Sequence, residues 1–400
     1  MKGSYFAAVV AGALLSLVPA GAQSPQTMQR LKNCYGYVGK ACDGRIAVST
    51  EKFGGNKVGK SVLDVHFGYV DTLGRTVIPV RFDYASDFSQ GLALVGIGPR
   101  GSRKFGFIDP EGREVVPIEY DDAETPREGL LKVMRRNGEE DPLWGYLSAT
   151  GEVVVPLEYG DLLKPAEGRI AAARGAWEAV EGADERAFMG RYGFLDYEGR
   201  EAIPFRYVDA HSFQEGLASV AVAGKYYPKW GFIDHEGHEV VAPKYYEVGN
   251  FCEGRAWVAR VVDGKLHYGY IDPAGNEVVA PQYASATNFK NGVALVSAFS
   301  TGNYAPYYLI GPNGTAKLPY AIYDVNDSGR YGHMTAAVPD STGLLRYGLL
   351  DRHGRRVLPF AYDQITIFSE WDAATQSWNE RGIAIQNGIE ATFSILRNQK

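Results

Sequence analysis

The sequence predicts an all-β repeat protein, and three observations lead to this fold class. A short aromatic–glycine step recurs along the chain at nearly constant spacing. Each copy is followed by a run of valine or isoleucine, which is typical of strands, and by the glycine and proline of turns. The composition, 45% hydrophobic and 22% charged, is that of an ordinary folded chain rather than a disordered one.

The chain begins with a predicted signal peptide, residues 1–22. Met1 and Lys2 precede an apolar stretch that runs to Val18, and Pro19-Ala20-Gly21-Ala22 supplies the small residues of a cleavage site. The apolar stretch of about 14 residues is shorter than the roughly 20 that cross a bilayer. We therefore expect cleavage after Ala22, no membrane span in the mature protein, and a periplasmic or extracellular location; an uncleaved anchor is the alternative.

Residues 23–43 form a predicted N-terminal segment that carries two of the three cysteines. Cys34 and Cys42 lie close together in the sequence of an exported protein, where disulfides persist. We expect them to pair and to contribute about 2 to 3 kcal/mol through loop closure. Two free thiols are the alternative, and Cys252 is interpreted as a lone small side chain.

The repeat itself is defined by the central residue of the aromatic–glycine step. Seven copies have glycine at this position, and in the remaining copy Tyr308 replaces the glycine. Successive central residues are separated by 38 to 40 residues, with the exception of one interval of 48 residues. In that interval, Trp177 to Arg186 is interpreted as an acidic loop insertion. The central positions are 68, 106, 145, 193, 231, 269, 308 and 348.

Within one unit the pattern predicts a three-strand antiparallel meander, with a short fourth strand at the following Tyr and Phe positions. The aromatic–glycine step opens the first strand, and Asp-Pro-Glu-Gly at 109–112 is a hairpin turn. A Val-Val segment is the second strand, and Gly-Leu-Ala-Leu-Val at 91–95 is the third. Because proline cannot donate to a ladder, we expect prolines such as Pro117 and Pro243 to end the second strand.

These motifs resemble the WG-repeat family, also called KWG repeats, over about residues 44–390. Phe105-Gly106-Phe107, Trp144-Gly145-Tyr146 and Trp230-Gly231-Phe232 carry the resemblance most clearly. The resemblance implies an all-β array and an interaction role, without a substrate or catalytic residues. Eight units therefore occupy 44–390, and residues 391–400 are a C-terminal tail.

The eight units predict a propeller-like ring in preference to an open β-solenoid. A single unit cannot bury its apolar face alone, so neighbouring units share a core, and closure protects strand edges. Residues 44–48 and 382–385 each resemble an unmatched third strand. We expect these two segments to complete one unit together if the ring closes.

Charge and motifs exclude several kinds of function. The formal net charge is −6, with basic and acidic residues mixed along the length, so we expect no nucleic-acid partner. No phosphate-binding loop, nucleophile elbow or cofactor motif occurs, and we expect neither a cofactor nor catalytic residues. His235 and His238 lie across a predicted turn rather than on a helix face, so we expect no metal there.

An aspartate closes the first strand in six copies, at positions 71, 109, 196, 234, 272 and 351. We interpret these side chains as hydrogen-bonding the backbone of the following turn. A rim of carboxylates that binds cations is the alternative. Ser148 takes the same position in another copy, as the turn interpretation predicts.

Aromatic residues outside the repeat pattern are the candidate binding residues. Loops on a rigid repeat scaffold are common binding sites, and exposed Tyr and Trp suit a protein partner or a sugar face. We expect a non-enzymatic binding or scaffold protein that engages a protein partner, with glycan or peptidoglycan binding as the alternative and a hydrolase as the least favoured reading. The candidates are Trp177, Tyr226, Tyr227, Tyr304, Trp371 and Trp378.

Overall fold

The computed structural model describes residues 25–50, 65–136, 141–175, 177–179, 186–300, 305–326, 332–372 and 377–395. The predicted signal peptide, residues 1–22, lies outside these ranges. No helix of the described residues is long and apolar enough to cross a membrane. The chain divides into two compact units: unit 1 comprises residues 1–135 and 147–152, and unit 2 comprises residues 136–146 and 153–400.

Unit 1 opens with the helix α1 (Pro25–Cys34), which proline begins because its missing N–H is not needed at the first helical position. Leu31 is buried against Ile46 and Val48 of the first sheet. That sheet contains β1 (Tyr37–Cys42), β2 (Arg45–Ser49), β3 (Phe67–Asp71) and β4 (Thr76–Phe82). The next contains β5 (Tyr84–Ala85), β6 (Ala93–Ile97), β7 (Lys104–Ile108) and β8 (Glu114–Tyr120).

The boundary between the units passes through the third sheet, and unit 2 continues the same antiparallel pattern. The third sheet contains β9 (Asp122–Ala123), β10 (Leu130–Arg135), β11 (Leu143–Ser148) and β12 (Val153–Tyr159). Three further four-stranded sheets follow it: β13 (Asp161–Leu162), β14 (Ile170–Arg174), β17 (Arg191–Leu195) and β18 (Glu201–Tyr207); β19 (Asp209–Ala210), β20 (Ala218–Val222), β21 (Lys229–Ile233) and β22 (Glu239–Tyr245); β23 (Glu247–Val248), β24 (Ala256–Val262), β25 (Lys265–Ile271) and β26 (Glu277–Tyr283).

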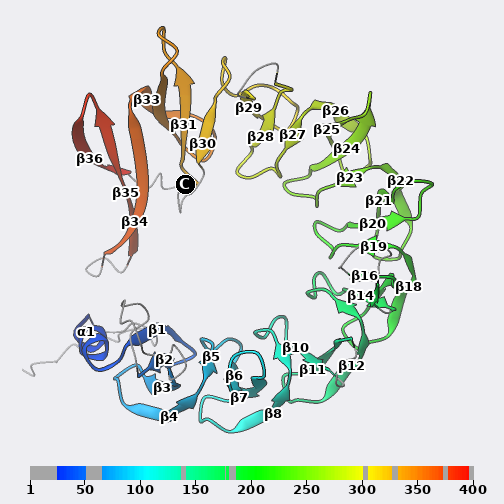
Figure 1. Ribbon diagram of the computed structural model, residues 1–400, viewed down its shortest axis with the longest axis vertical. Coiled ribbons are helices and arrows are strands. Elements are labelled where there is room, and N and C mark those ends of the chain that lie inside the picture. The colour runs from blue at the N-terminus through cyan, green and yellow to red at the C-terminus, as the bar shows by residue number, and fades with distance from the viewer. Residues whose placement is uncertain are drawn as a thin grey trace, which may run out of the picture. The chain divides into compact units, whose positions relative to one another are not determined.

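The last three sheets of unit 2 are less regular, and two of them have three strands. Figure 1 shows them as successive neighbours along the chain. They contain β27 (Ser285–Ala286), β28 (Ala294–Ser297) and β29 (Tyr307–Ile310); β30 (Asp324–Asn326), β31 (Met334–Pro339), β32 (Leu345–Leu350) and β33 (Arg356–Tyr362); β34 (Gln364–Asp372), β35 (Ser377–Gln386) and β36 (Ile389–Ile395).

The all-β prediction is confirmed, but each sheet combines two sequence copies. The short strand and the third strand of one copy pair with the first and second strands of the next, as in the order β23-β24-β25-β26. None of the sheets formed by the described residues closes on itself. Within unit 2, successive sheets such as β19–β22 and β23–β26 bury apolar side chains against each other, and adjacent copies thereby share a core.

The prediction that proline ends the second strand is wrong. Pro117 lies inside β8 and Pro243 inside β22. Both strands are at the edge of their sheets, so the missing N–H of proline leaves no gap in a ladder. The strand pairing also shifts in register at this point, between Trp230 and Phe232 opposite β22.

This shift in register explains why glycine occupies the centre of the aromatic–glycine step. The edge strand crosses directly over Gly231, where a Cβ atom would lie 2.3 Å from the carbonyl oxygen of Val241. Gly68 and Gly106 face the same crossing, and a Cβ atom on either residue would lie 2.6 Å from backbone atoms of the edge strand. Only glycine accommodates this approach of two backbones.

Tyr308 breaks the rule, and its sheet lacks the edge strand. The sheet β27-β28-β29 has three strands, and the chain that would pair with β29 makes only the isolated bridges of Tyr307 with Ile322 and of Ile310 with Ala316. A tyrosine side chain occupies the position at which regular sheets bring the edge strand close. The copy that lacks the glycine is thus also a copy in which the pairing with the edge segment is reduced to two isolated bridges.

An aromatic pair fills the core between neighbouring regular sheets. One ring comes from the strand that follows the glycine, and the other is a phenylalanine from the next interstrand loop. Phe232 and Phe251 meet edge to face with centroids 4.9 Å apart, and both are buried. The equivalent pairs are Tyr69–Phe88, Phe194–Phe213 and Tyr270–Phe289.

A carboxylate ladder provides a second link between neighbouring copies of unit 2. Glu253 and Gly254 both have positive φ and form a two-residue turn whose N–H groups point outward. The Glu215 carboxylate accepts both N–H groups, at 2.6 and 2.8 Å. Glu167 binds the turn at Glu215 in the same way, and Glu253 binds the turn at Asn291.

The predicted disulfide between Cys34 and Cys42 is not formed, and both are free thiols. Cys34 ends α1, whereas Cys42 lies at the far end of the extended strand β1. At about 3.3 Å per residue, a strand of this length spans well over the roughly 7 Å that a disulfide tolerates between Cα atoms. Burial is the largest factor that raises the pKa of the Cys42 thiol, and the Asp87 charge adds to it.

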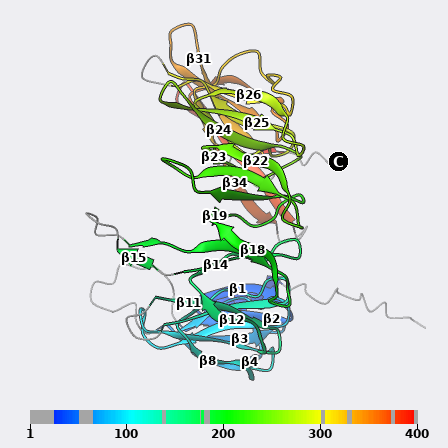
Figure 2. The same ribbon diagram turned by 90° about the vertical axis from the view of Figure 1, so that its right-hand side faces the viewer.

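Two further predictions about the ends and the insertion need correction. Residues 44–48 fall on β2, which pairs with β1 and β3, and residues 382–385 fall on β35, which pairs with β34 and β36. Each strand has both edges occupied in its own sheet, so neither is an unmatched strand awaiting the other. The insertion is not simply a loop: β15 (Trp177–Ala179) and β16 (Arg186–Phe188) form a hairpin that extends away from the β14 sheet (Figure 2).

Candidate binding surfaces

The best-defined candidate surface is a group of tyrosines and lysines on the loop between β20 and β21. Tyr226 is 82% exposed, and the Lys225 ammonium lies 4.9 Å from its ring centroid. Tyr227 is half-buried, and the Lys229 ammonium lies 4.1 Å from its centroid. Two of the predicted binding residues thus lie together on one loop.

Tyr246 completes this group from the other side. It lies between β22 and β23, and its ring is 4.6 Å from that of Tyr227 at a tilt of 56°. We call Tyr226, Tyr227, Tyr246, Lys225 and Lys229 the tyrosine cluster. Sequence reasoning missed Tyr246, because it follows the core residue Tyr245 and was counted among the repeat positions.

The loop that carries the cluster is held by its own backbone and by the sheet. A Cβ at Gly224 would lie 2.2 Å from the carbonyl oxygen of Tyr227, so the loop folds tightly back on itself. The contact with Tyr246 anchors Tyr227, while Tyr226 projects into solvent. The loop therefore presents one aromatic ring with a supported neighbour, which reduces the entropy lost on binding.

The other predicted binding residues are placed less fully. Trp371 and Trp378 lie directly opposite each other in the pairing of β34 with β35, and Trp177 pairs with Phe188 in the insertion hairpin. Tyr304 lies outside the described residues.

The recurrent aspartate has a consistent local role. In the turn after β7, one carboxylate oxygen of Asp109 accepts the backbone N–H groups of Glu111 and Arg113, and the other accepts the Arg113 side chain. Ser148 accepts the equivalent backbone groups through its hydroxyl. The geometry favours the turn interpretation over a rim that gathers cations.

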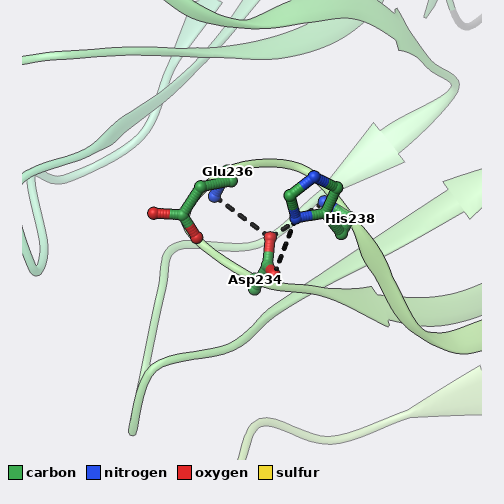
Figure 3. A group of neighbouring side chains, drawn as sticks. All are labelled: Asp234, Glu236 and His238. Atoms are coloured by element: carbon green, nitrogen blue, oxygen red, sulfur yellow. Dashed lines mark hydrogen bonds and ion pairs between the residues drawn. The ribbon is translucent and has the colours of Figure 1, made fainter.

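One copy of this turn has the composition of a metal site. Asp234, Glu236 and His238 place one ligand atom each within 4.8 Å of one another, and Figure 3 shows the contacts that reach Asp234 from Glu236 and His238. The His238 ring replaces the arginine of other copies and lies 3.1 Å from the Asp234 carboxylate. The ring thus takes the position at which other copies carry the arginine that contacts the turn aspartate, and these contacts are explained without a metal.

The pKa of Asp234 agrees with this description. Burial alone would raise it, but hydrogen bonds from the backbone and ring of His238, together with the ring's charge, outweigh burial and lower the pKa below its ordinary value. His235, the other histidine of this turn, stacks on Phe213 at 4.2 Å and contacts the carbonyl of Glu167. The two histidines are therefore not brought together as a ligand pair.

Comparison with family models matches a repeat described as "WG containing repeat" to seven segments. Together they cover more than half of the chain. The copy around Tyr308, which lacks the glycine and the edge strand, falls between two matched segments. The matches are residues 67–98, 105–138, 144–174, 192–226, 230–260, 268–297 and 347–373.

Solved structures with some similarity include two proteases and a domain of a third. An acylaminoacyl peptidase of Pyrococcus horikoshii has 14% identity and a TM-score of 0.33, over 75% of this chain and 57% of its own. The β-propeller domain of the Trilobed protease of Pyrococcus furiosus, described as having an open velcro topology, has 12% identity and a TM-score of 0.33, over 70% and 99%. The tricorn protease has 12% identity and a TM-score of 0.27, over 90% and 47%.

This chain thus spans little more than half of the peptidase that it resembles. No curated protein matches the sequence.

Proposed function

From the premise that this chain belongs to the family of WG-containing repeat proteins, we propose that it is an exported, non-enzymatic binding or scaffold protein that engages a protein partner. The observation that carries the proposal is the tyrosine cluster. An exposed ring, a supported second ring and two lysines project from a scaffold of packed sheets. Tyrosine is enriched in the central residues of protein interfaces because it supplies a large, stiff and amphipathic contact area.

The lysines favour a protein partner with an acidic patch. They place two positive charges on a chain whose net charge is −6, so the cluster differs in sign from the protein as a whole. Charge complementarity speeds encounter and orients the partner, while the tyrosine rings supply the apolar contact. We propose that acidic side chains of the partner surround an apolar residue that packs on Tyr226.

Glycan or peptidoglycan binding is the second candidate, since an exposed tyrosine can stack on a sugar. The same lysines argue against it. Their ammonium groups lie over the faces of Tyr226 and Tyr227, which are the surfaces that a sugar ring would need. Displacing them costs the cation–π attraction of about 0.5 to 1 kcal/mol each at exposed sites.

The test is affinity capture from a cross-linked envelope extract, followed by titration of the captured protein in purified form. Replacement of Tyr226 and Tyr227 by serine should weaken the direct interaction at least tenfold, because two aromatic contacts are lost. Replacement of the exposed Tyr37 by serine is the control and should leave affinity unchanged. Equal affinity of both variants and the parent would exclude the tyrosine cluster as the binding surface.

Export is proposed on the predicted signal peptide alone. Mass spectrometry of the protein recovered from its native cell should find Gln23 as the first residue, and its recovery outside the cytoplasm would accompany that cleavage. An intact Met1 in the mature protein would contradict the proposal.

We further propose that the sheets assemble as a propeller-like ring. Shared cores between sheets that follow one another in sequence, and the protection that closure gives to edge strands, support a ring over an open array. Small-angle scattering distinguishes the two, since an open array of these sheets has a larger maximum dimension than a ring. A long, rod-like distance distribution would contradict the ring.

A further inference from the structure

The strand β36 of the last sheet is paired on one side. Among the strands that the structure describes, it pairs with β35 alone. In the order β34-β35-β36 it has the place that β25 has in a regular sheet, and no described strand takes the place of β26. The backbone groups on the far side of β36 are therefore open to a further strand, which is the mode of recognition called β-augmentation.

Regular sheets protect this edge with proline, and β36 does not. In each four-stranded sheet of the described residues, the last strand in chain order contains a proline, as Pro117 in β8 and Pro243 in β22. Proline has no N–H to donate, so it discourages an edge strand from pairing with another chain. β36 contains neither proline nor lysine, and Glu390 is its one charged residue.

The turn before β36 fixes which backbone groups point outward. Asn387 and Gly388 both have positive φ and join β35 to β36 as a two-residue hairpin. Gln386 and Ile389 close this hairpin as a hydrogen-bonded pair, and bonding to β35 then alternates along the strand. The residues whose N–H and C=O groups point away from β35 are therefore Glu390, Thr392 and Ser394.

The hairpin is held in place by its own sheet. The Asp363 carboxylate accepts the N–H of Asn387 at 2.6 Å, and the Asp363 N–H donates to the carbonyl of Ile385 at 2.7 Å. Phe393 of β36 lies over Gly382 of β35, where a Cβ atom would overlap the ring. An edge strand that is ordered before it meets another strand loses less entropy on pairing.

The side chains of β36 alternate between an apolar face and a polar face. Ile389, Ala391, Phe393 and Ile395 share the apolar face, because alternate residues of a strand point to the same side. Ile395 is buried, whereas Ile389 is 73% exposed. The apolar face is thus covered at one end of the strand and open at the other.

We propose that β36 pairs with β36 of a second copy of this chain, in an antiparallel arrangement centred on Thr392. The outward backbone groups are symmetric about Thr392, so this arrangement places Thr392 opposite itself and Glu390 opposite Ser394 of the second copy. An antiparallel pair of this kind exchanges two hydrogen bonds, and three such pairs give about six. All the outward groups of the edge are then satisfied.

The side chains also favour antiparallel pairing of the strand with itself. A parallel pairing in register would place Glu390 beside Glu390 of the second copy, whereas the antiparallel pairing places it opposite the neutral Ser394. Ile389 then lies opposite Ile395 of the second copy, so the apolar face continues from one copy to the other. This surface uses no residue of the tyrosine cluster and does not depend on the partner proposed for it.

The test is sedimentation of the purified full chain at concentrations from about 1 to 200 µM. An edge of this length is a small interface, so the parent should change from monomer to dimer within that range. Thr392→Pro removes the outward N–H at the centre of the pairing and leaves the ladder with β35 intact, so it should weaken the dimer at least tenfold. Thr392→Val keeps the N–H and is the matched control, which should dimerise within about threefold of the parent.

A charge exchange tests the register. Ser394→Glu places a carboxylate opposite Glu390 of the second copy at both ends of the pairing, so it should weaken the dimer about tenfold. Combining it with Glu390→Lys converts both contacts to opposite charges and should restore the affinity to within about threefold of the parent. Both residues are exposed, so this pair of variants carries the test if Thr392→Pro does not fold.

Hydrogen exchange measures the edge directly. The outward amides of Glu390, Thr392 and Ser394 should exchange at least tenfold more slowly at the highest concentration than at the lowest. Three results would overturn the proposal. The first is a parent that stays monomeric throughout the range, and the second is an unchanged dimer in folded Thr392→Pro or Ser394→Glu. The third is slow exchange of these amides in the monomer, which would show that another segment of the same chain covers the edge.

Discussion

The sheets β23–β26 and β27–β29 follow each other in the chain and show what a single glycine controls. In the first, Gly269 lets the edge strand β26 cross β25, because a Cβ atom at this position would lie only 2.3 Å from the carbonyl oxygen of Val279. In the second, Tyr308 occupies that position and no edge strand forms. A regular copy is thus a sheet of four strands with a filled core, and the altered copy is a sheet of three strands beside a cleft.

The difference shows that each motif residue has a structural role at a particular contact. The glycine permits the crossing, the next aromatic fills the core, and the loop phenylalanine packs against that aromatic. The altered copy has Tyr308 and Leu309 where regular copies have the glycine and the strand aromatic, and a cleft of about 490 Å³ lies beside Leu309. The following predictions test this comparison, from the largest expected effect to the smallest.

Truncating the loop ring of a regular copy should cause the largest loss of stability. Phe251→Ala should lower the free energy of unfolding by about 3 to 5 kcal/mol, because a fully buried ring is lost and the core cannot collapse around it. Leu309→Ala in the altered copy should cost less, about 2 kcal/mol, since Leu309 already borders an open cleft. Urea unfolding measures both, and equal losses would contradict the difference in packing.

Adding a Cβ atom under the edge strand should lower the free energy of unfolding nearly as much as the loss of the Phe251 ring. Gly231→Ala should lower the free energy of unfolding by about 2 to 3 kcal/mol, since the new atom meets the backbone of Val241 rather than a movable side chain. Hydrogen exchange should accelerate in β22, the strand that must shift. Tyr308→Gly is the converse control, and a change beyond about 1 kcal/mol there would show that the tyrosine has a packing role of its own.

Removing one carboxylate of the carboxylate ladder should lower the free energy of unfolding moderately. Glu215→Ala should cost about 1 to 2 kcal/mol, because the outward N–H groups of Glu253 and Gly254 lose their acceptor. Glu215→Gln keeps one acceptor oxygen, as Gln90 does for Gly129 in unit 1, and should lose less. Thermal unfolding compares the three proteins, and no loss in the alanine variant would show that water replaces the carboxylate without cost.

The smallest effect should come from acid titration of the turn aspartates. Hydrogen bonds from the Asn276 side chain and backbone are the main factors that hold the pKa of Asp272 below its ordinary value of 3.8. Because the folded pKa is the lower one, this contribution to stability is present above the unfolded pKa and is lost as pH falls through the folded pKa. Asp272→Asn should therefore flatten the fall in unfolding temperature below about pH 4. An identical pH profile in parent and variant would contradict this assignment.

The sequence by itself was enough to predict the all-β class, the family and the position of the irregular copy. Spacing and turn residues are local properties of the chain, so the position 308 exception and the 48-residue interval are visible without coordinates. The turn role of residues such as Asp109 was predictable for the same reason, since its partners lie within four residues. Tyr226 and Tyr227 were proposed as binding residues because they fall outside the repeat pattern, and this remains a prediction.

Only the tertiary structure decided how the copies share their parts. Pro243 lies inside a strand because that strand has a free edge, and Cys34 stays apart from Cys42 because β1 is extended between them. Tyr246 joins the tyrosine cluster and Leu309 meets Met334 across a cleft through contacts between separate sheets. Such contacts depend on packing between segments distant in sequence, which a repeat pattern read along the chain does not describe.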